Sequence, residues 1–148
     1  MSSEQVVGGS ALKARDESWA GEYALPHSRR SPSLARVLVG QALAGCPPEL
    51  VDTAQLLVSE LVTNAVKHAD SILVLRIAAM DERWRVTVED LSADPPQQHE
   101  SDSEVEVGRG LGLVDLLATT WGWARTTTGK QVWFELTVSP DEGGRTGL

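Results

Sequence analysis

The spacing of apolar residues along the chain predicts two consecutive helices in its first half. Residues 31–45 carry an apolar stripe at helical spacing and begin with serine and proline, which favour a helix start. Pro47 and Pro48 end this helix and begin the next one. Over residues 49–69 the apolar positions cover more than one stripe, so this helix is predicted to be central and buried on more than one side.

After residue 69 the spacing of apolar residues changes from the helical repeat to the patterns typical of strands. Four segments are rich in β-branched residues or alternate between apolar and polar positions, namely 71–80, 84–89, 121–127 and 131–138. Short polar turns join them in pairs, which predicts two antiparallel hairpins. A helix over 108–118 separates the hairpins, and 20–25 is a candidate edge strand.

Helices gathered into blocks between hairpins predict an α+β two-layer sandwich. The expected sheet is mixed, mostly antiparallel, with the helices on one face. A chain of 148 residues fits one domain, which we place at 19–138. Residues 1–18 and 139–148 are polar and rich in turn formers, so we expect flexible tails there. Residues 91–107 contain two prolines and five carboxylates, and we expect a lid-like loop.

Composition limits the kinds of binding partner and the cellular compartment that we expect for this chain. The formal net charge of −8 argues against binding nucleic acid, which depends largely on Lys and Arg. The chain has no apolar run long enough to span a membrane, and its first residues lack the pattern of a secretion signal. Cys46 is its single cysteine, so no intrachain disulfide can form. We therefore expect a cytoplasmic protein without direct contacts to nucleic acid or membrane.

Three polar residues on the central helix are candidates for chemistry. Glu60, Asn64 and His68 recur every four residues within an apolar stretch, so they share one stripe of the helix. An amide oxygen suits Mg²⁺, and a carboxylate one turn away can accept a proton from a hydroxyl group. The same pattern also fits a solvated flank, or a histidine that caps the helix end.

Two further signals follow in the second half of the chain. Asp90 ends an apolar strand, where it could accept a hydrogen bond from the amino group of a flat ligand, although strand-end aspartates often only start turns. Gly108, Gly110 and Gly112 open a helix, and such glycines allow backbone amides to approach a phosphate. Without other evidence, a glycine cluster also fits a hinge or a turn.

The three signals together resemble the GHKL ATPases, a superfamily that includes histidine kinases, gyrase B and Hsp90. The segment 60–68 resembles the N-box, 88–90 the start of the G1 box and 108–114 the G2 box. SELVTNAVKHA and GKQVWFEL are similar to the small bacterial branch that contains anti-sigma factor serine/threonine kinases. The resemblance covers nearly all of 19–138 in order and spacing.

The resemblance implies a role for each matching residue. Asn64 would bind Mg²⁺, Glu60 would be the general base, and Asp90 would bind the adenine amino group. The segment Gly108, Arg109, Gly110, Leu111 and Gly112 would meet the phosphates of ATP, with Lys67 and Arg109 as charge partners. His68, at the helix end, would complete the nucleotide-binding set.

The sequence also departs from the family pattern. Both G1 glycines are missing, because Ser92 and Asp94 stand at those positions. In the last hairpin Gln131 and Val132 replace the second glycine and the threonine that usually touches adenine. These departures suggest weakened nucleotide binding.

The resemblance implies an ATP–Mg²⁺-dependent serine/threonine kinase that phosphorylates an anti-anti-sigma protein of the STAS type and controls a sigma factor. A homodimer is also implied. The alternative is a non-catalytic module that senses a nucleotide, or binds none, and presents a protein-binding surface. A stand-alone ATP hydrolase is less favoured, because those relatives carry an additional transducer domain.

Overall fold

The computed structural model describes residues 18–91 and 111–138. The predicted tails lie outside these ranges except for Ser18, which is not part of a flexible tail because it pairs with Ala79 as the first residue of a strand. Almost all of the predicted lid also lies outside them, as do Gly108, Arg109 and Gly110. Within them, no helix is long and apolar enough to cross a membrane.

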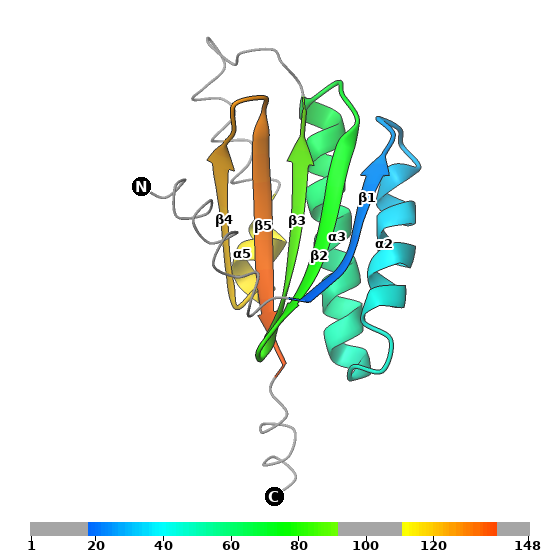
Figure 1. Ribbon diagram of the computed structural model, residues 1–148, viewed down its shortest axis with the longest axis vertical. Helices are drawn as coiled ribbons and strands as arrows, with labels where there is room; N and C mark the ends of the chain where they lie inside the picture. The colour runs from blue at the N-terminus through cyan, green and yellow to red at the C-terminus, as the bar shows by residue number, and fades with distance from the viewer. Residues whose placement is uncertain (1–17, 92–110, 139–148) are drawn as a thin grey trace, which may run out of the picture.

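All the helices and strands predicted within the described ranges are present. In chain order they are β1 (Ser18–Leu25), α2 (Ser31–Ala42), α3 (Pro48–His68), β2 (Leu73–Met80), β3 (Arg83–Asp90), α5 (Gly112–Leu117), β4 (Thr120–Arg125) and β5 (Lys130–Thr137) (Figure 1). Helix α2 ends three residues before the predicted end at Gly45. Gly45 has a φ of +95°, a left-handed conformation that turns the chain toward α3.

The five strands form one sheet in the order β1-β2-β3-β5-β4, and all four pairings are antiparallel. Two helices connect β1 to β2, so the chain returns in the opposite direction. Strands β3 and β4 run the same way, because each pairs antiparallel with β5, which lies between them. The sequence predicted a mixed sheet, but every pairing between described strands is antiparallel, since β3 and β4 do not pair with each other.

The helices cover one face of the sheet, as predicted (Figure 1). Helix α3 contacts β3 and β5 at the middle of the sheet, α2 contacts β1 and β2, and α5 lies between α3 and β4. The result is a two-layer α+β sandwich with α3 at the centre of the helical layer.

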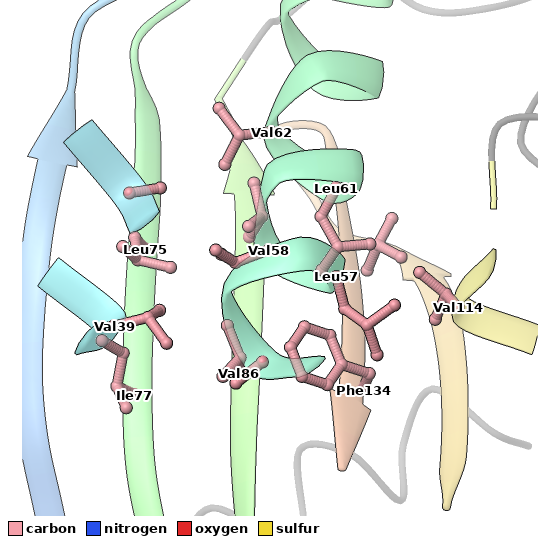
Figure 2. Close-up of a cluster of buried hydrophobic side chains, with 14 of the residues drawn as sticks. Val39, Leu57, Val58, Leu61, Val62, Leu75, Ile77, Val86, Val114 and Phe134 are labelled. Carbon is pink, nitrogen blue, oxygen red and sulfur yellow. The ribbon is translucent and has the colours of Figure 1, made fainter. Parts of the chain in front are cut away.

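The hydrophobic core lies between α3 and the sheet (Figure 2). Alternate residues of each strand point toward the helices, among them Ile77, Val86 and Phe134, which are fully buried. The residues that α3 buries in the core are Ala54, Leu57, Val58, Leu61 and Val62. At about 100° per residue they occupy an arc of roughly 140° on one side of the helix, which is wider than a single stripe and explains the wide apolar face seen in the sequence.

The tryptophans of the last hairpin divide between the two faces of the sheet. Trp121 and Trp123 are partly buried and pack against the core. Trp133 lies on the face without helices, because it alternates with Val132 and Phe134 along β5. Its ring fills the space above Gly122, where an added Cβ would lie 2.6 Å from the Trp133 ring.

Candidate functional site

A small cavity forms where the central helix meets the ends of β3 and β5. Its lining comes from Leu61, Asn64 and Ala65 of α3, Val88 and Asp90 of β3, and Lys130 and Val132 of β5. The cavity has a volume of about 10 Å³, room for a single water molecule. The fold therefore brings together two residues that the sequence singled out 26 positions apart, Asn64 and Asp90.

Asn64 occupies the buried flank of α3. Only 8% of the residue is exposed, and it lies one turn after Leu61 on the side of the helix that faces the sheet. Glu60, one turn earlier, is half-buried and does not line the cavity. Of these two polar residues, only Asn64 therefore lines the cavity.

Asp90 closes the sheet side of the cavity. It is the last residue of β3, and its backbone lies between Leu73 of β2 and Lys130 of β5. Strand alternation places Asp90 on the same face as Val86 and Val88, so it points toward the helices. At 6% exposure its carboxylate is shielded from bulk water, and a ligand hydrogen bond there would face little competition from solvent.

Gly129 supports Asp90 from the turn between β4 and β5. A Cβ added at Gly129 would lie well under 3.0 Å from both Asp90 Oδ1 and the Asp90 backbone oxygen. Because one of these atoms belongs to the backbone, rotation of a side chain cannot relieve the overlap. Glycine is therefore required at 129 for the close approach of the turn to Asp90.

Gly129→Ala is expected to lower the free energy of unfolding by about 1–3 kcal/mol, because overpacking forces the turn away from Asp90. Gly112→Ala is the matched control, since a Cβ there would meet nothing within 4 Å. Urea unfolding of both variants measures the difference. Equal stability of the two variants would contradict the tight packing against Asp90.

Lys130 is a cavity residue that the sequence reasoning missed. It stands opposite Asp90 in the β3–β5 ladder and lies on the same face as Val132 and Phe134. The sequence pattern of the hairpin could have indicated that Lys130 faces the helices, because it lies an even number of residues before the buried positions 132 and 134 of β5. Only the strand register, which the sequence does not specify, shows that it faces Asp90.

The last two residues of α3 lie outside the cavity. Lys67 and His68 are exposed and do not line it. A different histidine contacts the end of this helix, since His27 Nε2 lies 2.9 Å from the backbone oxygen of Val66. The contact links residues 39 positions apart, so no local sequence pattern indicated it.

The described end of the glycine-rich segment leads into α5. Leu111 is fully buried at the helix start, and its carbonyl accepts a hydrogen bond from the Asp115 amide at 2.9 Å. Gly112 is exposed. Leu111 thus anchors this segment in the core.

The oxygen atoms that the site offers are suited to a hard metal ion that enters the site together with a bound ligand. The described residues contain no group of three or more His, Cys, Asp or Glu that could hold a metal on its own. Asn64 and Glu60 offer oxygen donors, which Mg²⁺ prefers, and Mg²⁺ commonly takes its remaining ligands from water and substrate phosphates. These residues therefore fit Mg²⁺ that arrives with a nucleotide better than a permanent metal centre.

Comparisons with known proteins agree with this geometry. The family model described as "Histidine kinase-like ATPase domain" matches residues 26–136. The structure of the RsbU and RsbW domains of Rv1364c from Mycobacterium tuberculosis aligns with a TM-score of 0.61 and 17% identity, covering 80% of this chain and 32% of that one. The histidine kinase domain of the blue-light activated histidine kinase EL346 from Erythrobacter litoralis aligns with a TM-score of 0.50 and 25% identity, covering 76% and 62%.

The chain therefore spans less than two thirds of either of these two structures. A search of curated proteins finds no match. The sandwich predicted from the sequence is confirmed by the fold that the chain shares with the first structure.

Proposed function

Because the chain belongs to the histidine kinase-like ATPase domain family, we propose that it binds ATP with Mg²⁺ and transfers a phosphoryl group to a partner protein. The observation that best supports this proposal is the shared cavity of Asn64 and Asp90. These are the two residues to which the family pattern assigns the metal and the adenine base.

Asp90 is suited to the adenine end of the nucleotide. Its carboxylate accepts a hydrogen bond from the amino group of the base, while Leu61, Val88 and Val132 supply apolar walls. The cavity as it stands is too small for a purine, so binding requires side chains to move apart. Lys130 has the longest and most flexible side chain of the lining residues, so it is the residue best able to move and open space for the base.

Asn64 and Glu60 are suited to the phosphate end. Asn64 would hold Mg²⁺ through its amide oxygen, and bound ATP–Mg²⁺ supplies the phosphoryl group to be transferred. Glu60 would accept the proton of the attacking hydroxyl group as general base. The further nucleotide-binding residues that we propose are Lys67, His68, Gly108, Arg109, Gly110, Leu111 and Gly112.

We assign the chain to the anti-sigma type of serine/threonine kinase. Its sequence resembles that branch at 59–69 and 129–136, and its fold is similar to the structure that contains an RsbW domain. The proposed substrate is a STAS-type anti-anti-sigma protein, and the proposed regulated partner is a sigma factor. The proposal includes a cytoplasmic location and a homodimer.

A phosphotransfer assay tests this function. The chain is incubated with Mg²⁺, ATP labelled on the γ-phosphate, and a captured partner that carries a phosphorylatable serine. We expect label on the partner, and none on a partner whose serine is replaced by alanine. Absence of transfer to any captured partner, with ATP bound, would contradict the kinase assignment.

One observation favours a second function, that of a non-catalytic nucleotide-responsive module. Val132 lines the cavity at the position where the family threonine touches adenine, so a hydroxyl contact to the base is missing. Together with Ser92 and Asp94 at the G1 glycine positions, this weakens the case for tight nucleotide binding. ATP binding without transfer in the same assay would support this alternative.

A further inference from the structure

Two side chains of opposite charge stand next to each other on the sheet side of the cavity. Asp90 and Lys130 are partners in the ladder between the neighbouring strands β3 and β5 (Figure 1), and both line the cavity, so they lie on the same face of the sheet. Cross-strand partners of this kind have Cβ atoms about 4.5–5.5 Å apart. A hydrogen-bond acceptor and a flexible cation are therefore side by side at this end of the site.

The rest of the sheet wall is apolar. The described residues that line the cavity from β3 and β5 are Val88, Asp90, Lys130 and Val132. An ionised carboxylate only accepts hydrogen bonds, whereas a lysine ammonium group only donates them. The two valine side chains do neither. Among the described residues of this wall, Lys130 is thus the one whose side chain can donate a hydrogen bond.

The helix wall adds a single polar side chain among its described residues. This wall consists of Leu61, Asn64 and Ala65, and only Asn64 carries a side-chain donor. In the function proposed above, Asn64 holds Mg²⁺ at the phosphate end of the nucleotide. A donor for the base is therefore expected from the sheet wall, beside Asp90.

The edge of adenine carries a donor and an acceptor next to each other. Its 6-amino group donates hydrogen bonds, and the adjacent ring nitrogen N1 accepts one. Asp90 can match only the amino group, because a carboxylate has no proton to donate. Enclosing N1 in a site shielded from water without a donor would cost part of the binding free energy. The base therefore needs a donor immediately beside the carboxylate.

We propose that Lys130 is a second residue that recognises the base, with its ammonium group donating a hydrogen bond to N1 of adenine while Asp90 accepts one from the amino group. The proposal rests on the proposed function, because it concerns the same nucleotide site. The long stem of Lys130 lets the side chain move aside to admit the base. Since its backbone is fixed opposite Asp90, the ammonium group stays within reach of the same edge of the base.

The position of Lys130 favours a contact with the base over a contact with the phosphates. It stands opposite Asp90, at the adenine end, whereas Asn64 and Glu60 are proposed for the phosphate end. A lysine that attracted the phosphates would strengthen the binding of every nucleotide equally. A lysine that donates to N1 instead discriminates between bases, so analogues of the base separate the two roles.

The test compares ATP with its 1-deaza analogue, in which a C–H group replaces N1. We expect the parent chain to bind ATP at least about tenfold more tightly than the analogue, because a hydrogen bond to a charged group is lost. Lys130→Met removes the ammonium group and keeps a long, flexible side chain. In this variant the preference is expected to fall to about threefold or less. Competition against a fluorescent nucleotide at fixed Mg²⁺ measures each affinity.

Gln131→Met is the matched control variant. Gln131 is the next residue of β5 and lies on the face of the sheet without helices, because it alternates with Lys130 and Val132. It is expected to keep the preference of the parent chain. The 7-deaza analogue of ATP is the control ligand, since it lacks a ring nitrogen far from N1. Lys130→Met is expected to change its affinity by the same factor as that of ATP.

Three results would overturn the proposal while the parent chain still binds ATP. An equal loss of affinity for ATP and the 1-deaza analogue in Lys130→Met would show that Lys130 attracts the phosphates. Tighter binding of both would show that Lys130 only obstructs the cavity. An unchanged preference for ATP would show that another group donates to N1. Failure of the parent chain to bind either nucleotide is a different result, which would contradict the proposed function and the base contact with it.

Discussion

Glu60→Gln is expected to slow phosphate transfer about 10²- to 10⁴-fold while the chain stays folded and binds ATP. The amide has the shape of the carboxylate but cannot accept the proton of the attacking hydroxyl group. Glu60 is half-buried and makes none of the ion pairs found between described residues, so the change leaves no buried charge without a partner. The initial rate of transfer at saturating ATP measures the effect.

Glu49→Gln is the matched control for this variant. Glu49 lies in the first turn of the same helix and is exposed, far along α3 from Asn64. Its replacement is expected to leave the rate unchanged. Transfer at the parental rate by the Glu60 variant, with intact ATP binding, would show that the assigned general base is wrong.

Asp90→Asn is expected to weaken ATP binding about 10- to 100-fold. The replacement puts an amide donor where the carboxylate accepts from the adenine amino group, and an unmatched buried polar group costs about 1–3 kcal/mol. Competition against a fluorescent nucleotide measures the affinity. Asp52→Asn, an exposed position on α3, is the control and is expected to bind as the parent does.

Inosine triphosphate distinguishes lost recognition from a damaged fold. It carries an oxygen acceptor where adenine has the amino group, so the side-chain amide introduced by Asp90→Asn can donate to it. We expect the variant to lose its preference for ATP over inosine triphosphate. An equal loss of affinity for both nucleotides would indicate structural damage and would remove the support for Asp90 as the base-reading residue.

The sequence predicted the elements well because their signals are local. The change of apolar period after residue 69 marks the end of α3, and polar turns separate the strands of each hairpin. The end of α2 was placed too late because residues 43–45 continue its composition. The backbone leaves helical geometry at Leu43, which has φ −97° and ψ 19°, and the left-handed conformation at Gly45 then turns the chain.

The arrangement of the strands was harder to predict, because it depends on contacts far apart in the chain. The insertion of β5 between β3 and β4 makes the described sheet antiparallel, and no local pattern specifies it. The same insertion places Lys130 opposite Asp90. Lys130 was therefore missed because the pairing of β3 with β5 could not be read from the sequence.

The candidate site was predicted in part for the same reason. Asn64 and Asp90 meet at one cavity because each ends up on the inner face of its own element, which periodicity predicts. The roles assigned to Glu60, Lys67, His68 and the glycine-rich segment stay predictions. They depend on a bound nucleotide and on residues 108–110, which lie outside the described ranges.

Calorimetric titration with Mg²⁺–ATP measures whether the chain binds a nucleotide at all. We expect heat that saturates at one nucleotide per chain, together with a melting temperature that rises with nucleotide concentration, since a ligand that binds only the folded state stabilises it. No heat and no change in melting temperature at millimolar nucleotide would contradict a nucleotide site between α3 and the ends of β3 and β5.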